Sequence, residues 1–184
     1  TDVRRGGFVP LEDDQAADLF AITRDLTAEA GLSAYEISNH ARPGEESRHN
    51  LTYWRYDDYA GIGPGAHGRR GGFATLRHKK PENWLDAVAR NGHGLKEERP
   101  LGVAEQASEA LLMGLRLAEG VDLQNLGSRL GIDSSALIDQ KKFEHYADIG
   151  LTWTNGARVG VTPDGMPLLD ALLAELVADE LVSA

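Results

Sequence analysis

The fold of the carboxyl-terminal part depends on one short stretch, Leu151-Thr152-Trp153-Thr154-Asn155-Gly156-Ala157-Arg158-Val159-Gly160-Val161. Asn155-Gly156 is the dipeptide best suited to a two-residue hairpin turn. Residues 151–154 are therefore expected to pair with residues 158–161 as two antiparallel strands. The sequence predicts a hairpin at this point, and helical patterns lie on both sides of it.

These helical patterns indicate the class of the carboxyl-terminal domain. Apolar residues recur at helical spacing over residues 103–118, and Asp122 is placed to cap a second helix. Asp133 or Ser134 is expected to cap a third helix, and a leucine-rich helix follows the hairpin. Three helices, a hairpin and a closing helix predict a winged-helix-like domain over residues 101–184.

The first part of the chain has the pattern of an α/β protein. Residues 14–30 carry apolar side chains at helical spacing, and Gly31 suits the position just after a helix end. Residues 33–38 are short and rich in β-forming side chains, so a strand is expected directly after that helix. A helix followed by a strand indicates the tail of a larger α/β sheet.

The middle of the chain is expected to consist of loops, a hairpin and a helix. Residues 39–58 are predicted to form a loop, and Arg70-Gly71-Gly72 is predicted to turn a hairpin. Pro81 suits the first position of a helix, and a linker is expected over residues 91–100. The predicted fold class is α+β.

Composition excludes several kinds of chemistry. The chain has 184 residues, is 41% hydrophobic and contains no cysteine, so disulfides, thiol nucleophiles and Cys-ligated zinc or iron-sulfur sites are absent from it. No stretch approaches the roughly 18 uninterrupted apolar residues of a membrane helix, and residues 1–7 lack the apolar run of a signal peptide. A soluble, cytoplasmic protein without an integral membrane segment is expected. The chain opens as though inside a loop, which favours a piece of a longer protein.

Net charge argues against a nucleic-acid partner. The total is -10, and residues 101–184 hold 5 Lys and Arg against 13 Asp and Glu. Such a surface repels a phosphate backbone. A nucleic-acid-binding function of the winged-helix-like domain is therefore disfavoured, and a protein-binding module stays open as an alternative.

The densest cluster of chemically versatile side chains is His49-Asn50-Leu51-Thr52-Tyr53-Trp54. An imidazole can ligate haem iron, and aromatic rings can lie against a porphyrin face. The same residues also fit a structural role, in which Tyr53 and Trp54 are core anchors and His49 and Asn50 hydrogen-bond to loop backbone. The residues alone leave both interpretations open.

A second candidate is the glycine-rich segment Gly61-Ile62-Gly63-Pro64-Gly65-Ala66-His67. Glycines after a strand allow the backbone to approach a ligand closely, often a nucleotide or nucleoside. Pro64 interrupts any dinucleotide fingerprint, so a tight structural turn explains the segment equally well. His40, His49 and His67 lack the spacing of metal ligands, so no protein-only metal site is expected. No catalytic residue is expected either, because the Ser, His and Asp residues offer no nucleophile elbow.

Three successive segments form a signature. They are Tyr35-Glu36-Ile37-Ser38-Asn39-His40-Ala41-Arg42-Pro43-Gly44, then Ser47-Arg48-His49-Asn50-Leu51-Thr52-Tyr53-Trp54, then Asp58-Tyr59-Ala60-Gly61-Ile62-Gly63-Pro64-Gly65-Ala66-His67-Gly68. Together they resemble the signature of the HemW-type haem chaperones, within the coproporphyrinogen III oxidase-like radical S-adenosylmethionine proteins. The resemblance continues through Glu119-Gly120-Val121 and Thr162-Pro163-Asp164-Gly165 to cover essentially the whole chain. Ser47 stands where many relatives have cysteine, although other relatives have serine.

The resemblance implies a fold and a set of cofactors. By this resemblance, residues 1–80 correspond to the last elements of the partial (β/α) barrel of radical S-adenosylmethionine proteins. Residues 81–100 correspond to a helix and linker, and residues 101–184 to the carboxyl-terminal domain. The parent protein is expected to use S-adenosylmethionine, a [4Fe-4S] cluster and haem. In the family, the cysteine motif that binds the cluster lies in the amino-terminal half of the protein. This chain is therefore expected to bind no cofactor stably and to be inactive alone.

The resemblance also implies site residues and partners. His49, Asn50, Tyr53 and Trp54 are the expected haem contacts, and Gly61, Gly63, Ala66 and His67 the expected contacts with S-adenosylmethionine. The expected partners are haem or porphyrin and a haem-accepting protein whose identity the sequence does not indicate. Oxygen-independent coproporphyrinogen III oxidase is the alternative function. Leu19, Phe20 and Ile37 are expected at an exposed barrel edge, where a homodimer is one outcome.

Overall fold

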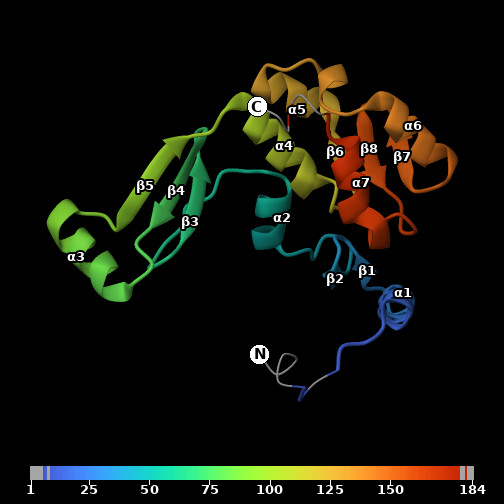
Figure 1. Cartoon of the computed structure of the whole chain (residues 1–184), viewed down its shortest axis with the longest axis horizontal. Helices are drawn as coiled ribbons and strands as arrows, with labels where there is room; N and C mark the ends of the chain where they lie inside the picture. Colours follow the sequence, from blue (N-terminus) through green and yellow to red (C-terminus); the bar gives the residue numbers. More distant parts are fainter. Residues whose placement is uncertain (1–5, 8, 179–180, 182–184) are drawn as a thin grey trace. The chain divides into compact units, whose positions relative to one another are not determined.

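The computed structural model describes residues 6, 7, 9–178 and 181 (Figure 1). Residues 1–5, at the start of the segment that lacks a signal-peptide pattern, lie outside this range. The helices and strands are α1 (Asp13–Glu29), β1 (Ser33–Ala34), β2 (His40–Ala41), α2 (Arg48–Trp54), β3 (His67–Arg70), β4 (Phe73–Arg77), α3 (Pro81–Asn91), β5 (Leu95–Pro100), α4 (Val103–Gly114), β6 (Val121–Asp122), α5 (Leu123–Leu130), α6 (Gln140–Asp148), β7 (Thr152–Asn155), β8 (Arg158–Val161) and α7 (Leu169–Leu176). Two 3-10 turns, Ser134–Ala136 and Met166–Leu168, complete them. The fold class is α+β, as predicted.

The chain forms two compact units, Thr1–Glu46 and Ser47–Ala184. In the first unit, α1 begins with Asp13 and Asp14, whose charges suit the positive end of the helix dipole. None of its residues is buried, and Leu19, Ile22 and Leu26 are each more than half exposed. The helix predicted over residues 14–30 is therefore confirmed within one residue at each end.

The strand predicted over residues 33–38 is wrong for most of its length. Only β1 is extended, and it pairs with β2 through Ser33 opposite Ala41. The next residues bend because the buried Glu36 carboxylate turns back to accept hydrogen bonds from the Ser38 amide, at 3.3 Å, and from the Asn39 side chain.

The loop predicted over residues 39–58 is also wrong, because it contains a helix. α2 begins after Ser47, whose hydroxyl accepts a hydrogen bond from the Asn50 amide at 3.4 Å. It ends at Trp54, and Tyr56 then takes a left-handed conformation with φ of 58°. The His49–Trp54 segment is thus helical, which decides which of its side chains share a face.

The second unit contains a three-stranded antiparallel sheet in the order β3-β4-β5 (Figure 1). The predicted hairpin is confirmed, with Arg70 opposite Phe73 across the two glycines. α3 connects β4 to β5 and begins at Pro81, as predicted. The predicted linker over residues 91–100 is wrong in its second half, because β5 pairs with β4 along the whole strand, with Thr75 opposite Glu98.

The carboxyl-terminal helices surround a second sheet, in the order β6-β8-β7 (Figure 1). The predicted hairpin is confirmed, with Asn155 opposite Arg158. Asp122 caps α5 as predicted, by accepting a hydrogen bond from the Asn125 amide at 2.9 Å. Buried leucines from α4, α5 and α7 provide much of the core, which includes Leu111, Leu126 and Leu176.

Two of the predicted helices are shorter than expected. α4 ends at Gly114 rather than residue 118, and the turn that follows brings Leu115 and Leu117 into the core, 0% and 1% exposed. The predicted third helix is interrupted, because Ile138 forms an extended bridge with Val177 before Asp139 caps α6. Tertiary pairing therefore overrides the local helical pattern at both places.

Candidate functional site

Two segments that the sequence analysis singled out line one surface pocket of the second unit. The pocket has a volume of about 570 Å³. Its walls are His49 and Tyr53 from α2 and a run from the loop before β3, namely Tyr59, Ala60, Gly61, Ile62, Ala66 and His67. The candidate haem motif and the candidate nucleoside-binding turn therefore meet at a single site.

The helical conformation of α2 aligns the first wall. His49 and Tyr53 are four residues apart, so their side chains lie on the same face of the helix. Their ring centroids are 4.7 Å apart in an edge-on arrangement. Tyr53 also packs against Tyr59, with ring centroids 4.3 Å apart. The three rings form a continuous aromatic wall.

The second wall is held in place by its glycines and by β4. A Cβ on Gly61 would overlap the carbonyl oxygen of His67, so only glycine allows the loop to close this tightly. The Arg77 side chain donates a hydrogen bond to the Gly61 carbonyl, and the Arg77 amide donates to the Ala66 carbonyl at 3.0 Å. The backbone of this wall is therefore preorganised.

A buried arginine contacts Tyr59, one member of the aromatic wall. Arg69 is 6% exposed, and its guanidinium carbon is 3.4 Å from the Tyr56 ring centroid and 5.5 Å from that of Tyr59. The Tyr56 hydroxyl donates a 2.6 Å hydrogen bond to Glu109. Burial raises the pKa of the Tyr59 phenol above its ordinary value, while the Arg69 charge acts in the opposite direction.

The eight predicted site residues divide between this pocket and its surroundings. His49, Tyr53, Gly61, Ala66 and His67 line it. The other three, Asn50, Trp54 and Gly63, are not among the described residues that line the pocket. Asn50 instead donates its amide to the Ser47 hydroxyl at the start of α2, and Trp54 faces a different pocket.

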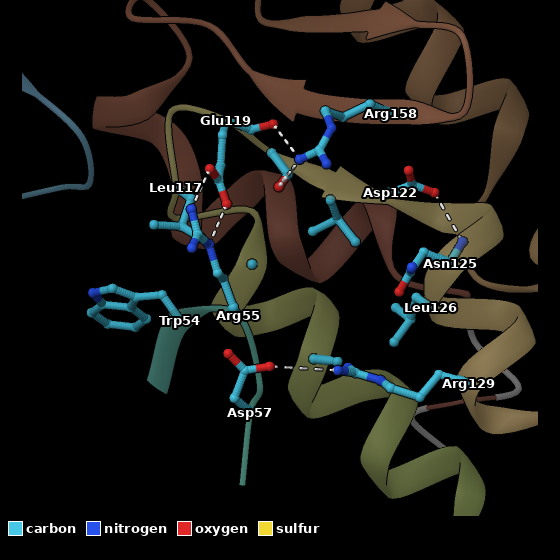
Figure 2. Close-up of a pocket in the computed structure, with 14 residues that line it drawn as sticks. Trp54, Arg55, Asp57, Leu117, Glu119, Asp122, Asn125, Leu126, Arg129 and Arg158 are labelled. Atoms are coloured by element: carbon cyan, nitrogen blue, oxygen red, sulfur yellow. Dashed lines mark hydrogen bonds and ion pairs between the residues drawn. The ribbon is translucent and has the colours of Figure 1, made fainter. Parts of the chain in front are cut away.

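That different pocket has a volume of about 340 Å³ and lies between the end of α2 and the carboxyl-terminal helices. Figure 2 shows Arg55 and Glu119 side by side at one edge of it, joined by hydrogen bonds of 2.7 and 2.8 Å. Arg129 approaches Asp57 to 4.0 Å at another edge (Figure 2). The hydrogen bond from Arg55 holds the pKa of the Glu119 carboxyl below its ordinary value, despite burial.

Sequence reasoning did not single out Tyr59 and Arg69 as members of the site. They form an isolated antiparallel bridge, with N–O distances of 2.7 and 3.0 Å. For Tyr59, the available signal was its position two residues before Gly61. Nothing in the local sequence around Arg69 distinguishes it from the neighbouring Arg70.

The donor set in the first pocket suits a porphyrin better than a metal ion alone. His49 and His67 supply imidazoles, and Tyr53 and Tyr59 supply aromatic faces. Within the described part of the chain, no three histidine, cysteine, aspartate or glutamate side chains gather as metal ligands. The chain has no cysteine, so its own residues do not fit a Cys-ligated iron-sulfur cluster.

None of the described helices combines the length and apolar character needed to cross a membrane.

Comparisons with known proteins agree on one family. A family model described as the HemN C-terminal domain matches residues 103–168. A mitochondrial radical S-adenosyl methionine domain-containing protein 1 from Bos taurus is 32% identical over 97% of this chain and 42% of its own length. Heme chaperone HemW from Bacillus subtilis is 32% identical over 89% of this chain and 44% of its own length.

A solved structure shows the same fold. Coproporphyrinogen III oxidase (HemN) from Escherichia coli, described as a radical SAM enzyme, superposes with a TM-score of 0.65 at 18% identity, over 89% of this chain and 41% of that one. The chain thus spans about two fifths of the length of these relatives. Together, the matches show that this chain corresponds to the carboxyl-terminal half of HemW-type radical S-adenosylmethionine proteins, which includes the HemN C-terminal domain.

Proposed function

We propose that this chain is the haem-contacting part of a HemW-type haem chaperone, and that His49 contacts the haem. One observation carries the proposal. His49, the Tyr53 and Tyr59 rings and the glycine-rich segment line a single pocket. An imidazole can ligate haem iron, and the two aromatic faces beside it can pack against a flat porphyrin.

The glycine-rich wall supports a second part of the proposal. Gly61 and Ala66, which carry no side chain and a single methyl group respectively, line the same pocket, so their backbone can come close to a ligand. A nucleoside such as the adenosine of S-adenosylmethionine suits such a wall, because small residues allow the backbone to approach it closely. The [4Fe-4S] cluster, which supplies electrons for reductive cleavage in radical S-adenosylmethionine proteins, needs cysteine ligands from another part of the parent protein.

The finer description of the fold is also part of the proposal. The order α4, β6, α5, α6, β7, β8 is the helix, strand, helix, helix and hairpin order of a winged helix, which supports a winged-helix-like domain over residues 101–184. Residues 1–80 are proposed to complete a partial (β/α) barrel, and a cytoplasmic location is proposed from the bacterial relatives. The predicted division at residues 80 and 100 stays a prediction.

The test is a haem titration of this chain followed by optical absorbance. We expect weak, reversible binding with a shifted Soret band, and a loss of affinity of about tenfold or more in His49→Ala. The alternative function, an oxygen-independent coproporphyrinogen III oxidase, predicts instead a preference for coproporphyrinogen III over haem that does not depend on His49. An unchanged titration in His49→Ala contradicts the proposed haem contact.

A further inference from the structure

Arg69 is a buried cation without a carboxylate partner in the described part of the chain. None of the ion pairs there, counted to 4.0 Å, includes it. Its Nη2 donates a 3.1 Å hydrogen bond to the Asp57 carbonyl, while its buried Nε has no hydrogen-bond partner among the described residues. Burying a charge in this way opposes folding, and an apolar side chain of similar size often stabilises such a position more. The charge of Arg69 therefore needs a compensating contact other than a carboxylate.

The charge is compensated by aromatic faces instead. The guanidinium stacks on the Tyr56 ring at 3.4 Å and lies 5.5 Å from the Tyr59 ring centroid. A planar guanidinium is well suited to such contacts, because it stacks on aromatic rings and is weakly hydrated. Glu109 lies one step further away, where it accepts the hydrogen bond of the Tyr56 hydroxyl.

The same arginine is connected to the proposed haem contact through successive ring contacts. Its guanidinium carbon lies 5.5 Å from the Tyr59 ring centroid, and its backbone pairs with that of Tyr59 in both directions, at 2.7 and 3.0 Å. Tyr59 packs on Tyr53 at 4.3 Å, and Tyr53 packs on His49 at 4.7 Å. We call Arg69, Tyr59 and Tyr53 the cation–tyrosine stack.

We propose that Arg69 is a positioning residue, which holds Tyr59 against Tyr53 and thereby fixes the orientation of the His49 imidazole at the pocket. The role of His49 toward haem rests on the proposed function. The positioning itself rests only on the contacts of the cation–tyrosine stack.

The first measurement needs no haem. The ring signals of His49 and Tyr53 are followed by NMR in the whole chain and in Arg69→Met, with Arg70→Met as the matched control. Arg70 is the next residue of β3 and is exposed, so its removal leaves the stack intact. We expect the His49 and Tyr53 signals to shift and broaden in Arg69→Met, to stay in place in Arg70→Met, and to recover partly in Arg69→Lys, which keeps the charge.

The second measurement is the haem titration of the same variants. Arg69→Met is expected to weaken haem binding by about threefold to tenfold, with the Soret band displaced from its wild-type position. Arg70→Met is expected to behave as wild type. If Arg69→Met does not fold, Tyr59→Leu breaks the stack at its next contact and is expected to give the same shift of the His49 signals.

Two outcomes separate this inference from the proposed function. Unchanged His49 and Tyr53 signals in a folded Arg69→Met or Tyr59→Leu variant overturn the positioning role, even where His49→Ala abolishes haem binding. If the ring signals shift in Arg69→Met but His49→Ala binds haem as tightly as wild type, the positioning role is supported and the proposed function is contradicted.

Discussion

Gly61 approaches the backbone of His67 so closely that a Cβ on Gly61 would overlap the His67 carbonyl oxygen. This contact closes the loop that forms the second wall of the pocket. The neighbouring Arg77 side chain donates to the Gly61 carbonyl and holds the loop from the other side. The geometry of the pocket therefore depends on a single missing methyl group.

Gly61→Ala is expected to destabilise the chain by about 2 to 3 kcal/mol, because the added methyl group must displace backbone rather than a mobile side chain. Urea unfolding with a fixed m-value measures the change. The matched control is Gly102→Ala, since Gly102 has a φ of -61° and open space around its Cβ position. Equal unfolding midpoints for the two variants would contradict the tight contact.

The Arg55–Glu119 ion pair predicts a small, pH-dependent contribution to stability. Both side chains are partly exposed, at 47% and 40%, so a double-mutant cycle is expected to give about 0.5 to 1 kcal/mol. Because Arg55 lowers the pKa of the folded Glu119 carboxyl, this stability is present above the ordinary value of 4.5 and is lost as the pH falls below it. Urea midpoints measured from pH 7 to pH 3 should therefore fall more steeply in wild type than in Arg55→Ala. Parallel profiles would show that the pair contributes nothing.

The Tyr56 hydroxyl predicts stability that is lost in alkali. Tyr56→Phe removes its 2.6 Å hydrogen bond to Glu109 and is expected to cost about 1 to 2 kcal/mol. Burial and the nearby Glu109 carboxylate raise the pKa of the Tyr56 phenol above 10.0, so the folded state holds this proton more tightly than the unfolded chain. Stability is thus fully present below pH 10 and falls as the pH rises above it.

The check is thermal unfolding between pH 8 and pH 11 in wild type and Tyr56→Phe. Tyr146→Phe is the control, because the Tyr146 hydroxyl makes no hydrogen bond with the described residues and only its ring packs, on His145. The difference in melting temperature between wild type and Tyr56→Phe should shrink as the pH rises. A constant difference would mean that Tyr56 titrates like an exposed tyrosine.

Features specified by neighbouring residues could be predicted from the sequence. Asp122 caps α5, Pro81 opens α3 and Asn155 begins a hairpin turn because each effect involves only a few adjacent residues. The helix α2 was missed because its seven residues carry no long apolar repeat. Its Ser47 cap was the signal that could have revealed it.

Long-range pairing could not be predicted in the same way. β5 is mostly charged and becomes a strand only because β4 supplies its hydrogen bonds, with Leu76 opposite Glu97. The resemblance to HemW-type proteins indicated both walls of the pocket. It did not indicate Arg69, because the ring contacts that distinguish Arg69 from Arg70 arise only when the chain is folded.

The central claim is that the His49 pocket contacts haem, and a Soret titration of this chain tests it most directly. The comparison is wild type against His49→Ala, with His145→Ala as a control at an exposed histidine of α6 outside the pocket. We predict a haem-dependent Soret shift in wild type and His145→Ala that is lost or weakened about tenfold in His49→Ala. The same shift in all three proteins, or no shift in any of them, would contradict the claim.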